Sequence, residues 1–263
     1  MATVTATTRM GVTTLTLENG RANAITPEMA DALTAAVQAL GNIGALVICG
    51  AGRFAFCTGS DIGELRRLHD AGEGPGPLLR RESEALEAIA ALEIPTIAAV
   101  RGLCLGGGLE LALCCDLIVA ANDARIGFPE VHLGAFPALG GPLRLARRIG
   151  VGRAMEMILD GRDIGADAAR NLGLVNRVVP SAEVIREAES WAIRLAQGPR
   201  DAFRAIKRSI RAALDLPEAE AIEAMLSEAE AHGSSPDVAE GLRAFDARET
   251  PAFWHNRKGS STL

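Results

Sequence analysis

The amino-acid sequence predicts an α/β protein with mostly parallel strand pairing, followed by a region that is helical only. Two observations support this prediction. Short apolar and β-branched runs alternate with helical patterns through the first two-thirds of the 263-residue chain, and this alternation is typical of parallel sheets. From Ser181 onward the pattern is helical without strands. We therefore divide the chain near Gly198-Pro199, into a core of residues 1–198 and a helical region of residues 199–263.

The individual elements follow from hydrophobic periodicity and helix-start signals. Strands are expected at residues 12–17, 45–49, 96–100, 117–120 and 174–178. Helices are expected in the core at residues 27–40, 62–70, 78–92, 107–115, 142–148 and 151–159. Further helices are expected at residues 181–197, 199–214, 217–231 and 235–247. The first helix has a clear start, because Pro27 stands between Thr26, a capping residue, and Glu28.

The composition restricts the class of protein. Hydrophobic residues make up 48% and charged residues 23% of the chain, which excludes a disordered or fibrous protein. The net charge of −6 argues against a nucleic-acid partner, since such partners select a basic face. No segment has the pattern of a signal peptide, and none reaches the roughly 18 apolar residues of a membrane span. We expect a cytoplasmic protein that binds neither membrane nor nucleic acid.

The five cysteines suit a reducing compartment. Their number is odd, and two of them, Cys114 and Cys115, are adjacent, which favours reduced core thiols over a disulfide framework. No C-x-x-C pair with partner histidines occurs. We therefore expect no metal site.

The first segment with chemical interest runs from residue 54 to 64. An apolar run ends in the small residues Thr58, Gly59 and Ser60, which would let a ligand approach the backbone. Asp61 and Glu64 then have the D-x-x-E spacing of a capping box, and an opening helix offers unpaired N–H groups. The alternative is a plain turn between a strand and a helix.

The second segment runs from residue 94 to 110 and contains three consecutive glycines, at 106–108. Each glycine at a helix start costs roughly 1 kcal/mol relative to alanine, which indicates a backbone exposed to a bound group. The positive end of the helix would face that group. Glu110 lies one turn into the helix, within an apolar run. Its alternative interpretation is an acidic residue stabilised by the helix dipole.

The third segment, residues 126–142, is a loop rich in proline and glycine that carries Glu130 and His132. Glu130 is either a functional carboxylate or a solvated loop charge. His132 has no serine or cysteine partner at a recognisable spacing. A G-x-S-x-G elbow around Ser60 would need glycine where Thr58 stands. These observations argue against a hydrolase triad.

Together these segments resemble the crotonase superfamily, the enoyl-CoA hydratase/isomerase family. The resemblance begins at Arg21-Ala22-Asn23-Ala24 and continues through CTGSDI, IPTIAAVRGLCLGGGLELALCCDLIVA and FPEVHLGAFPALGG. It ends in EGLRAFDARETPAF at residues 240–253. It implies a spiral of ββα units and a C-terminal helical region that trimerises, giving a homotrimer or a hexamer of two trimers. It also implies an acyl-CoA thioester as substrate and no separate cofactor, since coenzyme A is part of the substrate.

The resemblance also implies roles for particular residues. Glu110 and Glu130 would be the catalytic pair, and the backbone N–H groups of Ser60 and Gly107 would form the oxyanion hole. The coenzyme A and substrate-binding residues would be Ala22, Ala24, Ser60, Asp61, Ile62, Gly106, Gly107, Pro129 and Leu133. The phosphates would meet Arg21, Arg53 or Arg248, each of which is otherwise a surface charge.

The sequence departs from the family pattern at two places. The family usually has alanine or glycine where Ser60 stands. The backbone donor survives that change, and we expect the hydroxyl to alter the polarity of the pocket. Leu139 stands where many hydratases have small residues, and we expect it to reshape the site near Glu130.

Two filled glutamate positions favour an enoyl-CoA hydratase, which adds water reversibly across the 2,3 double bond. Two carboxylates that flank one water allow syn addition, with Glu110 activating the water and Glu130 delivering a proton to Cα. The alternatives are an enoyl-CoA isomerase or another acyl-CoA lyase of the same family, in which one carboxylate acts alone. A non-catalytic acyl-CoA-binding protein is a third alternative.

Overall fold

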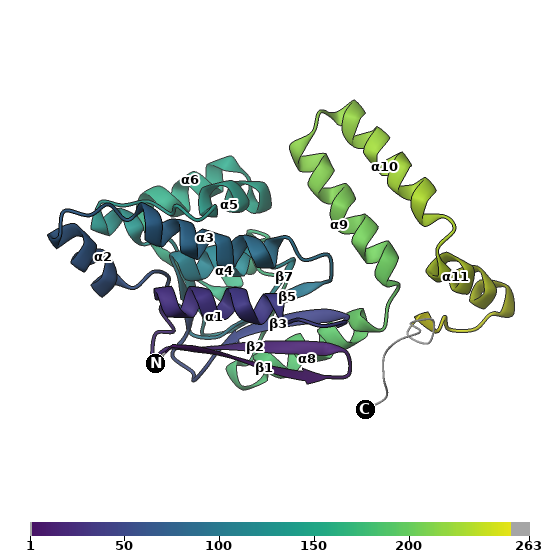
Figure 1. Cartoon of the computed structure of the whole chain (residues 1–263), viewed down its shortest axis with the longest axis horizontal. Helices are drawn as coiled ribbons and strands as arrows, with labels where there is room; N and C mark the ends of the chain where they lie inside the picture. The colour runs from purple at the N-terminus through teal and green to yellow at the C-terminus, as the bar shows by residue number, and fades with distance from the viewer. Residues whose placement is uncertain (1, 254–263) are drawn as a thin grey trace.

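Two β-sheets form the centre of the fold in this computed structural model, which describes residues 2–253 (Figure 1). The larger sheet has the order β1-β2-β3-β5-β7-β10, and the smaller has the order β4-β6-β8-β9. Among the strands of residues 2–253, only the pairs β1–β2 and β8–β9 are antiparallel. The larger sheet contains β1 (Thr3–Arg9), β2 (Val12–Glu18), β3 (Ala45–Gly50), β5 (Thr96–Val100), β7 (Leu117–Ala121) and β10 (Arg177–Val179). The smaller sheet contains β4 (Ala55–Cys57), β6 (Leu103–Leu105), β8 (Arg125–Gly127) and β9 (Asp163–Gly165).

The chain repeats a strand–strand–helix unit that alternates between the two sheets. Strands β3, β5 and β7 belong to the larger sheet, and each is followed by a strand of the smaller sheet, β4, β6 or β8. Helices α2 (Ile62–Asp70) and α3 (Gly76–Ala90) follow β4, and α4 (Gly107–Cys114) follows β6. A short 3-10 helix (Glu130–Leu133) and α5 (Gly141–Ile149) follow β8. This is the expected spiral of ββα units, and its parallel strands bring the segments after β4, β6 and β8 to one edge of the smaller sheet.

Helices cover both faces of the larger sheet. Helix α8 (Val184–Ala196) packs on β2, β3, β5 and β7, on the face opposite α1 (Pro27–Gln38) and α3 (Figure 1). Every residue of β3 and β5 is buried, as expected for parallel strands covered on both faces. Side chains such as Leu46, Ile48 and Ile97 are fully buried, and each stabilises the fold by about 1.5–3 kcal/mol. The remaining core helices are α6 (Val151–Asp160) and α7 (Ala166–Asn171).

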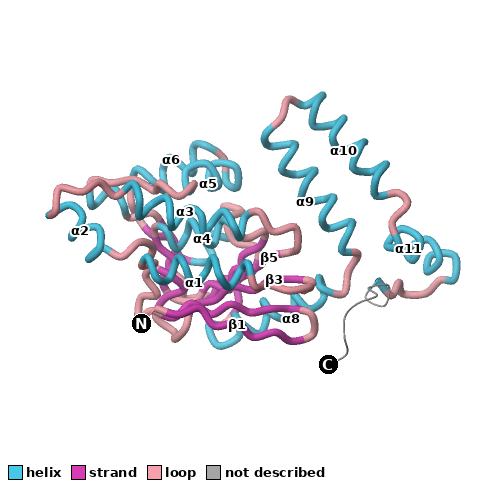
Figure 2. Tube along the Cα trace, viewed as in Figure 1, coloured by secondary structure: helices cyan, strands magenta, loops and turns pink. Residues whose placement is uncertain are grey.

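The C-terminal helices form an arm that stands away from the sheets (Figures 1 and 2). The arm contains α9 (Arg200–Asp215), α10 (Glu218–His232) and α11 (Pro236–Ala247). Its base is tied to the core by Lys207, whose Nζ donates to the Ile94 carbonyl at 2.8 Å and to Asp116 at 2.6 Å. The division expected near Gly198 falls between α8 and α9, and residues 254–263 lie outside the described residues. No helix in residues 2–253 combines the length and the apolar composition needed to cross a membrane.

Four of the five expected strands are confirmed, and the fifth was misplaced. Within residues 174–178 only the end is extended, because the strand is Arg177–Val179. The Asn176 side chain accepts from Ile118 N–H at 2.8 Å, and Leu174 and Val175 are buried without pairing in a strand. Their burial explains the apolar pattern that suggested a strand.

The sequence did not reveal five strands and one helix. Strands β4, β6, β8 and β9 have three residues each, too few for a period-2 pattern to emerge. Strand β1 is mostly exposed and rich in threonine, so it lacks an apolar face. Helix α7 has six residues. The expected helix at 181–197 begins with a 3-10 turn, Ser181–Glu183, before α8.

Candidate active site

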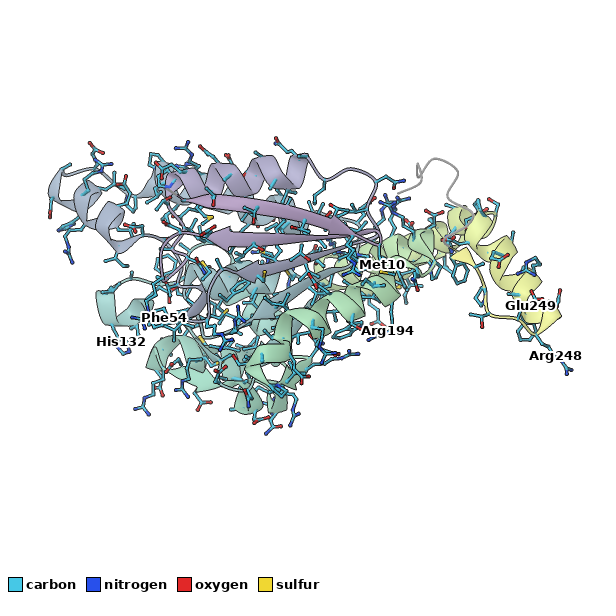
Figure 3. All side chains as sticks on the ribbon, turned by 90° about the horizontal axis from the view of Figure 1, so that it is seen from below. Met10, Phe54, His132, Arg194, Arg248 and Glu249 are labelled. Carbon is cyan, nitrogen blue, oxygen red and sulfur yellow. The ribbon has the colours of Figure 1, made fainter. Side chains whose placement is uncertain are left out.

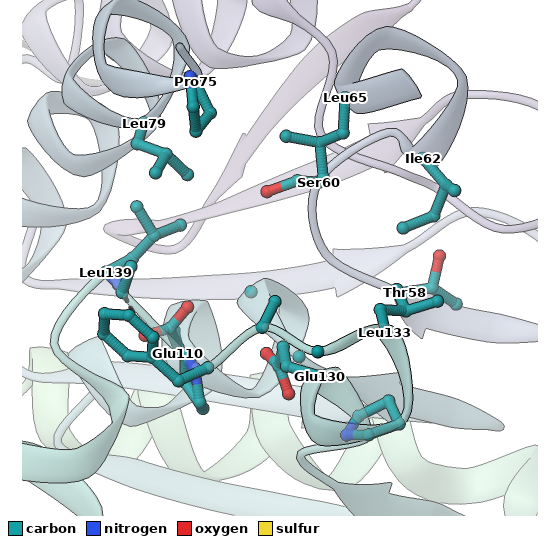
Figure 4. Close-up of a pocket in the computed structure, with 18 residues that line it drawn as sticks. Thr58, Ser60, Ile62, Leu65, Pro75, Leu79, Glu110, Glu130, Leu133 and Leu139 are labelled. Atoms are coloured by element: carbon teal, nitrogen blue, oxygen red, sulfur yellow. Dashed lines mark hydrogen bonds between the residues drawn. The ribbon is translucent and has the colours of Figure 1, made fainter. Parts of the chain in front are cut away.

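A pocket of about 350 Å³ opens at the edge of the smaller sheet where the segments after β4, β6 and β8 meet (Figure 4). Eight of the residues predicted from the sequence line it: Ser60, Ile62, Gly106, Gly107, Glu110, Pro129, Glu130 and Leu133. They come from three segments that are far apart in the sequence, and the ββα spiral brings them together.

Glu110 is the most buried carboxyl group of the pocket wall, with 2% of its surface exposed. It lies on α4, and its Oε1 accepts hydrogen bonds from the N–H groups of Leu139 and Gly141, both at 2.7 Å. Gly141 must be small, because a methyl group there would lie 2.8 Å from the same oxygen. Two backbone donors therefore hold the carboxyl group in one orientation while it faces the pocket.

Burial raises the pKa of Glu110 to about 7. The two backbone donors lower the pKa and the neighbouring Glu130 raises it, but desolvation is the largest effect. A group with this pKa is able to exchange a proton near neutral pH, which is what general acid–base catalysis requires.

Glu130 is the second carboxyl group of the pocket, and it is half-buried at the start of the 3-10 helix. Desolvation raises its pKa as well. Its Oε2 is buried and has no hydrogen-bond partner within residues 2–253. The Glu130 side chain nevertheless belongs to a residue that lines the pocket. Figure 4 shows Glu110 and Glu130 on the same side of the pocket, with Ser60 on another wall.

Each of the three consecutive glycines has its own steric reason. A methyl group at Gly106 would lie 2.9 Å from Glu130 Oε1, and Gly106 also has a φ of +54°. A methyl group at Gly108 would lie 2.0 Å from the Cys57 carbonyl oxygen, so glycine lets α4 pack directly on β4. A methyl group at Gly107 would lie 3.2 Å from Gly59 Cα, a tight contact, and 3.5 Å from the Ser60 nitrogen.

The backbone N–H groups of Ser60 and Gly107 are neighbours in the pocket wall. Ser60 forms a parallel bridge with Ile25, in which Ile25 N–H donates to Gly59 at 2.8 Å and Asp61 N–H donates to Ile25 at 3.1 Å. Because residues 59 and 61 make these bonds, the N–H of Ser60 points away from Ile25. Gly107 is the first residue of α4, so its N–H has no partner inside the helix. Within the described chain neither N–H has a hydrogen-bond acceptor.

Three predicted binding residues do not line the pocket. Ala22 and Ala24 lie in the loop before Ile25 and are half-buried. Asp61 caps α2, and its carboxylate accepts from Glu64 N–H at 2.9 Å. The expected capping box is only half formed, because the Glu64 carboxylate pairs with Arg67 and the Asp61 N–H donates to Ile25.

The arginines proposed for phosphates lie in different places. The Arg21 guanidinium stacks over the ring of Phe54 at 4.0 Å, an arrangement typical of a cation–π contact. Arg248 lies at the far end of the arm from Phe54 (Figure 3). The two arginines of one chain are therefore unable to share a ligand. His132, for which the sequence offers no serine or cysteine partner, is exposed and contacts the Gly161 carbonyl at 3.2 Å, and it does not line the pocket.

Sequence reasoning missed three polar residues around the site. Asn23 is fully buried with a φ of +50°, and its Nδ2 donates to the carbonyls of Ala51 at 3.1 Å and Ala55 at 2.9 Å. Arg144 donates to the Leu139 carbonyl at 3.0 Å, on the loop that holds Glu110. Glu82 is fully buried on α3 and accepts from the Ser60 hydroxyl at 2.5 Å. Of these three, only Asn23 could have been found from the sequence, since it lies within the family motif Arg21-Ala22-Asn23-Ala24.

Leu139 occupies the position the sequence marked as unusual. It is 3% exposed and lines the pocket while its N–H donates to Glu110. The rest of the lining includes apolar residues of α2, of the start of α3, and of the 3-10 helix and the loop after it: Ile62, Leu65, Pro75, Leu79, Leu133 and Phe136. The pocket therefore combines an apolar chamber with a few directed polar groups, as small-molecule sites usually do. No cluster of three or more histidine, cysteine or acidic residues suited to a metal ion occurs in residues 2–253.

Comparisons with known proteins agree with this geometry. The family model described as enoyl-CoA hydratase/isomerase matches residues 7–256. A probable enoyl-CoA hydratase of Mycobacterium bovis is 36% identical over 253 residues, covering 94% of this chain and 95% of that protein. The short-chain-enoyl-CoA hydratase of Clostridium acetobutylicum is 35% identical, covering 81% of each chain.

Solved structures match over nearly the whole chain. The enoyl-CoA hydratase of Bacillus anthracis has a TM-score of 0.86 at 31% identity, covering 94% of this chain and 97% of that one. An enoyl-CoA hydratase from Polaromonas has a TM-score of 0.89 at 29% identity, covering 95% and 98%. Fold and site thus define an α/β enzyme of the crotonase type. The chain belongs to the enoyl-CoA hydratase/isomerase family.

Proposed function

We propose that this protein is an enoyl-CoA hydratase that adds water reversibly, in syn geometry, across the 2,3 double bond of an enoyl-CoA thioester. The observation that carries the proposal is the pairing of two carboxyl groups, Glu110 and Glu130, in one pocket with two unpaired backbone N–H groups. The relatives named as enoyl-CoA hydratases support the same reaction.

In the proposed mechanism, the thioester oxygen binds between the N–H groups of Ser60 and Gly107. Addition at Cβ moves negative charge onto this oxygen and produces an enolate-like transition state. Fixed N–H donors stabilise that charge, and each such donor contributes a factor of roughly 10²–10³ in rate. The N-terminus of α4 adds its positive dipole end to the same point.

The two glutamates divide the proton transfers. Ionised Glu110, held by Leu139 and Gly141, positions a water molecule and removes its proton as the oxygen attacks Cβ. Glu130 delivers a proton to Cα from the same face. Each positioned acid or base contributes a factor of about 10²–10⁴. The charge of the neighbouring Glu130 also raises the pKa of Glu110, so ionisation of one carboxyl group disfavours ionisation of the other.

We further propose that coenzyme A extends from the pocket along Ala22, Ala24, Asp61 and Ile62, with Gly106, Pro129 and Leu133 enclosing the thioester. The Ile25–Ser60 bridge supports this path, because it holds the loop of Ala22 and Ala24 beside Ser60. Coenzyme A enters as part of the substrate, so the reaction uses no separate cofactor. The five cysteines are buried and free, which supports the expected cytoplasmic location.

We propose that the arm of α9, α10 and α11, within the helical region of residues 199–263, forms the trimer interface of a homotrimer, or of a hexamer of two trimers. Large apolar side chains lie exposed on the arm: Ile206, Ile210, Leu214, Ile222, Leu226, Leu242 and Phe245. Extended apolar surface of this kind marks an interaction site. Sedimentation velocity should show a trimer or hexamer for the natural chain and a smaller species for Ile210→Asp. The exposed Glu223 of the same arm, changed to lysine, serves as the control.

The decisive experiment follows the loss of conjugated thioester absorbance with crotonyl-CoA in the natural protein, Glu110→Gln and Glu130→Gln. We expect rapid loss in the natural protein and a collapse in both variants. Carrying out the reaction in ¹⁸O-labelled water distinguishes the family's reactions, since hydration places solvent oxygen in the product and isomerisation does not. Tight binding of crotonyl-CoA without turnover would contradict the hydratase and favour an isomerase or a binding protein.

A further inference from the structure

The pocket has a third carboxyl group behind its wall. Glu82 on α3 is 0% exposed, and its Oε2 lies 2.5 Å from the Ser60 hydroxyl oxygen. Its other oxygen, Oε1, is also buried and has no hydrogen-bond partner within the described chain. Ser60 itself lines the pocket. Glu82 therefore reaches the pocket only through the hydroxyl group of Ser60.

Among residues 2–253, no cation acts on the carboxyl group of Glu82. The acidic groups that bear on it are Glu110 from α4 and Asp61 from the start of α2, and the Cys57 thiol of β4 also lies close enough to interact. On the side of α1, Arg81 pairs with Asp31 rather than with Glu82. An ionised carboxylate in such a place is costly, because burial without a cation disfavours charge. Burial accordingly raises the pKa of Glu82 to about 7.

The protonation state of Glu82 decides which way the Ser60 hydroxyl points. An ionised Glu82 only accepts hydrogen bonds, so it takes the Ser60 O–H and leaves oxygen lone pairs facing the pocket. A neutral Glu82 is able to donate its own proton to Ser60 Oγ across the same short contact. The Ser60 O–H is then free to turn into the pocket, beside the N–H of the same residue.

We propose that Glu82 is a positioning residue whose neutral form orients the Ser60 hydroxyl as a third hydrogen-bond donor to the thioester oxygen. This inference rests on the proposed function in one respect, since it places the thioester oxygen at Ser60 and Gly107. It assigns a joint role to two residues, the unusual serine and the buried glutamate. The serine supplies the donor, and Glu82 controls whether that donor is available.

Acetoacetyl-CoA tests the proposal without requiring turnover. Its enolate has its own absorbance, so the fraction enolised on binding reports how well the pocket stabilises an oxyanion. The enolate fraction is compared for the natural protein, Ser60→Ala, Glu82→Gln and the double variant, at about pH 6 and about pH 9, on either side of the Glu82 pKa. Glutamine stays neutral and is able to donate to Ser60 at both pH values. The control is Glu84→Gln, which removes a carboxylate from the exposed face of the same helix.

At about pH 6 we expect Ser60→Ala to lower the enolate equilibrium roughly 10- to 100-fold, which is at or below the 10²–10³-fold effect of losing one oxyanion donor because the two backbone N–H groups remain. Glu82→Gln should match the natural protein at that pH and exceed it at about pH 9. In the Ser60→Ala background, Glu82→Gln should have no further effect, because the two residues act as one unit. In crotonyl-CoA hydration, Ser60→Ala should lower kcat with little change in KM.

Full enolisation in Ser60→Ala, or a Glu82→Gln variant that follows the natural protein at both pH values, would overturn the proposal. Failure of the proposed function has a different signature. If crotonyl-CoA is not hydrated while the enolate fractions follow the expected pattern, the hydratase assignment fails and the role of Ser60 and Glu82 stands.

Discussion

Replacing Glu110 with glutamine is expected to remove hydratase activity while making the folded protein more stable. The amide oxygen of glutamine is able to accept the two hydrogen bonds that Oε1 receives from Leu139 and Gly141. The local geometry is therefore kept. What is lost is the ability to take a proton from water, which should lower kcat by a factor of about 10²–10⁴.

The gain in stability follows from the pKa of Glu110, which burial raises from 4.5 to about 7. Between these values the folded state binds a proton that the unfolded chain has released, so stability falls as the pH rises through this window. At 1.36 kcal/mol per pKa unit, the full cost above pH 7 is about 3 kcal/mol. Glutamine has no such cost. The stability advantage of Glu110→Gln should therefore grow by about 2–3 kcal/mol between roughly pH 5 and pH 8.

Urea unfolding at the two pH values measures this change, at one fixed protomer concentration because assembly also contributes to stability. The advantage corresponds to a midpoint shift of roughly 1 M urea at the higher pH. Glu84→Gln, on the exposed surface of α3, should show no comparable pH-dependent gain. An advantage of Glu110→Gln that is the same at both pH values would refute the link between burial and the raised pKa. Retained activity would refute the catalytic role.

Three further outcomes are expected. Gly107→Ala places a methyl group 3.2 Å from Gly59 Cα and 3.5 Å from the Ser60 nitrogen, so crotonyl-CoA hydration should fall roughly 10²–10³-fold. The circular dichroism spectrum should be unchanged, and normal activity would show that the thioester carbonyl binds elsewhere. The rate of hydration should rise as Glu110, whose pKa burial raises to about 7, becomes ionised; a flat pH profile would contradict its role as the base. Asn23→Ala leaves the buried Ala55 carbonyl without its donor, so the free energy of unfolding measured in urea should fall by about 1–3 kcal/mol. An unchanged unfolding midpoint would show that water replaces the amide.

The sequence predicted the site better than it predicted the sheet that builds the site. The glycine run at 106–108 indicated a backbone exposed to a ligand, and the structure gives a separate close contact for each of the three residues. Strands β4, β6 and β8, which precede Ser60, Gly107 and Glu130, were not predicted, because three residues are too few for a periodic pattern. Their pairing depends on neighbours from other turns of the spiral, which no local window contains.

Glu82 shows why some functional residues escape a reading of the sequence. In the run RRESEALE it looks like one more charge on the solvent face of an amphipathic helix. Its burial depends on α3 packing against α1 and α4, which is a property of the tertiary structure. Its partner Ser60 lies 22 residues earlier. The sequence alone shows serine at position 60 where the family usually has alanine or glycine, but it does not show that Glu82 contacts this serine.

The charges around the pocket are arranged so that Glu110 remains able to exchange a proton near neutral pH. Arg144 is the cation that acts on Glu110, and its pull lowers the pKa of that carboxyl group. Its guanidinium does not pair with Glu110 but donates hydrogen bonds to the Leu139 carbonyl at 3.0 Å and to the Glu87 carboxylate at 2.5 Å. A direct ion pair with Glu110 would hold the carboxylate ionised and weaken it as a base. By binding the loop rather than the glutamate, Arg144 fixes the two N–H donors that orient Glu110 and leaves desolvation as the dominant effect on its pKa.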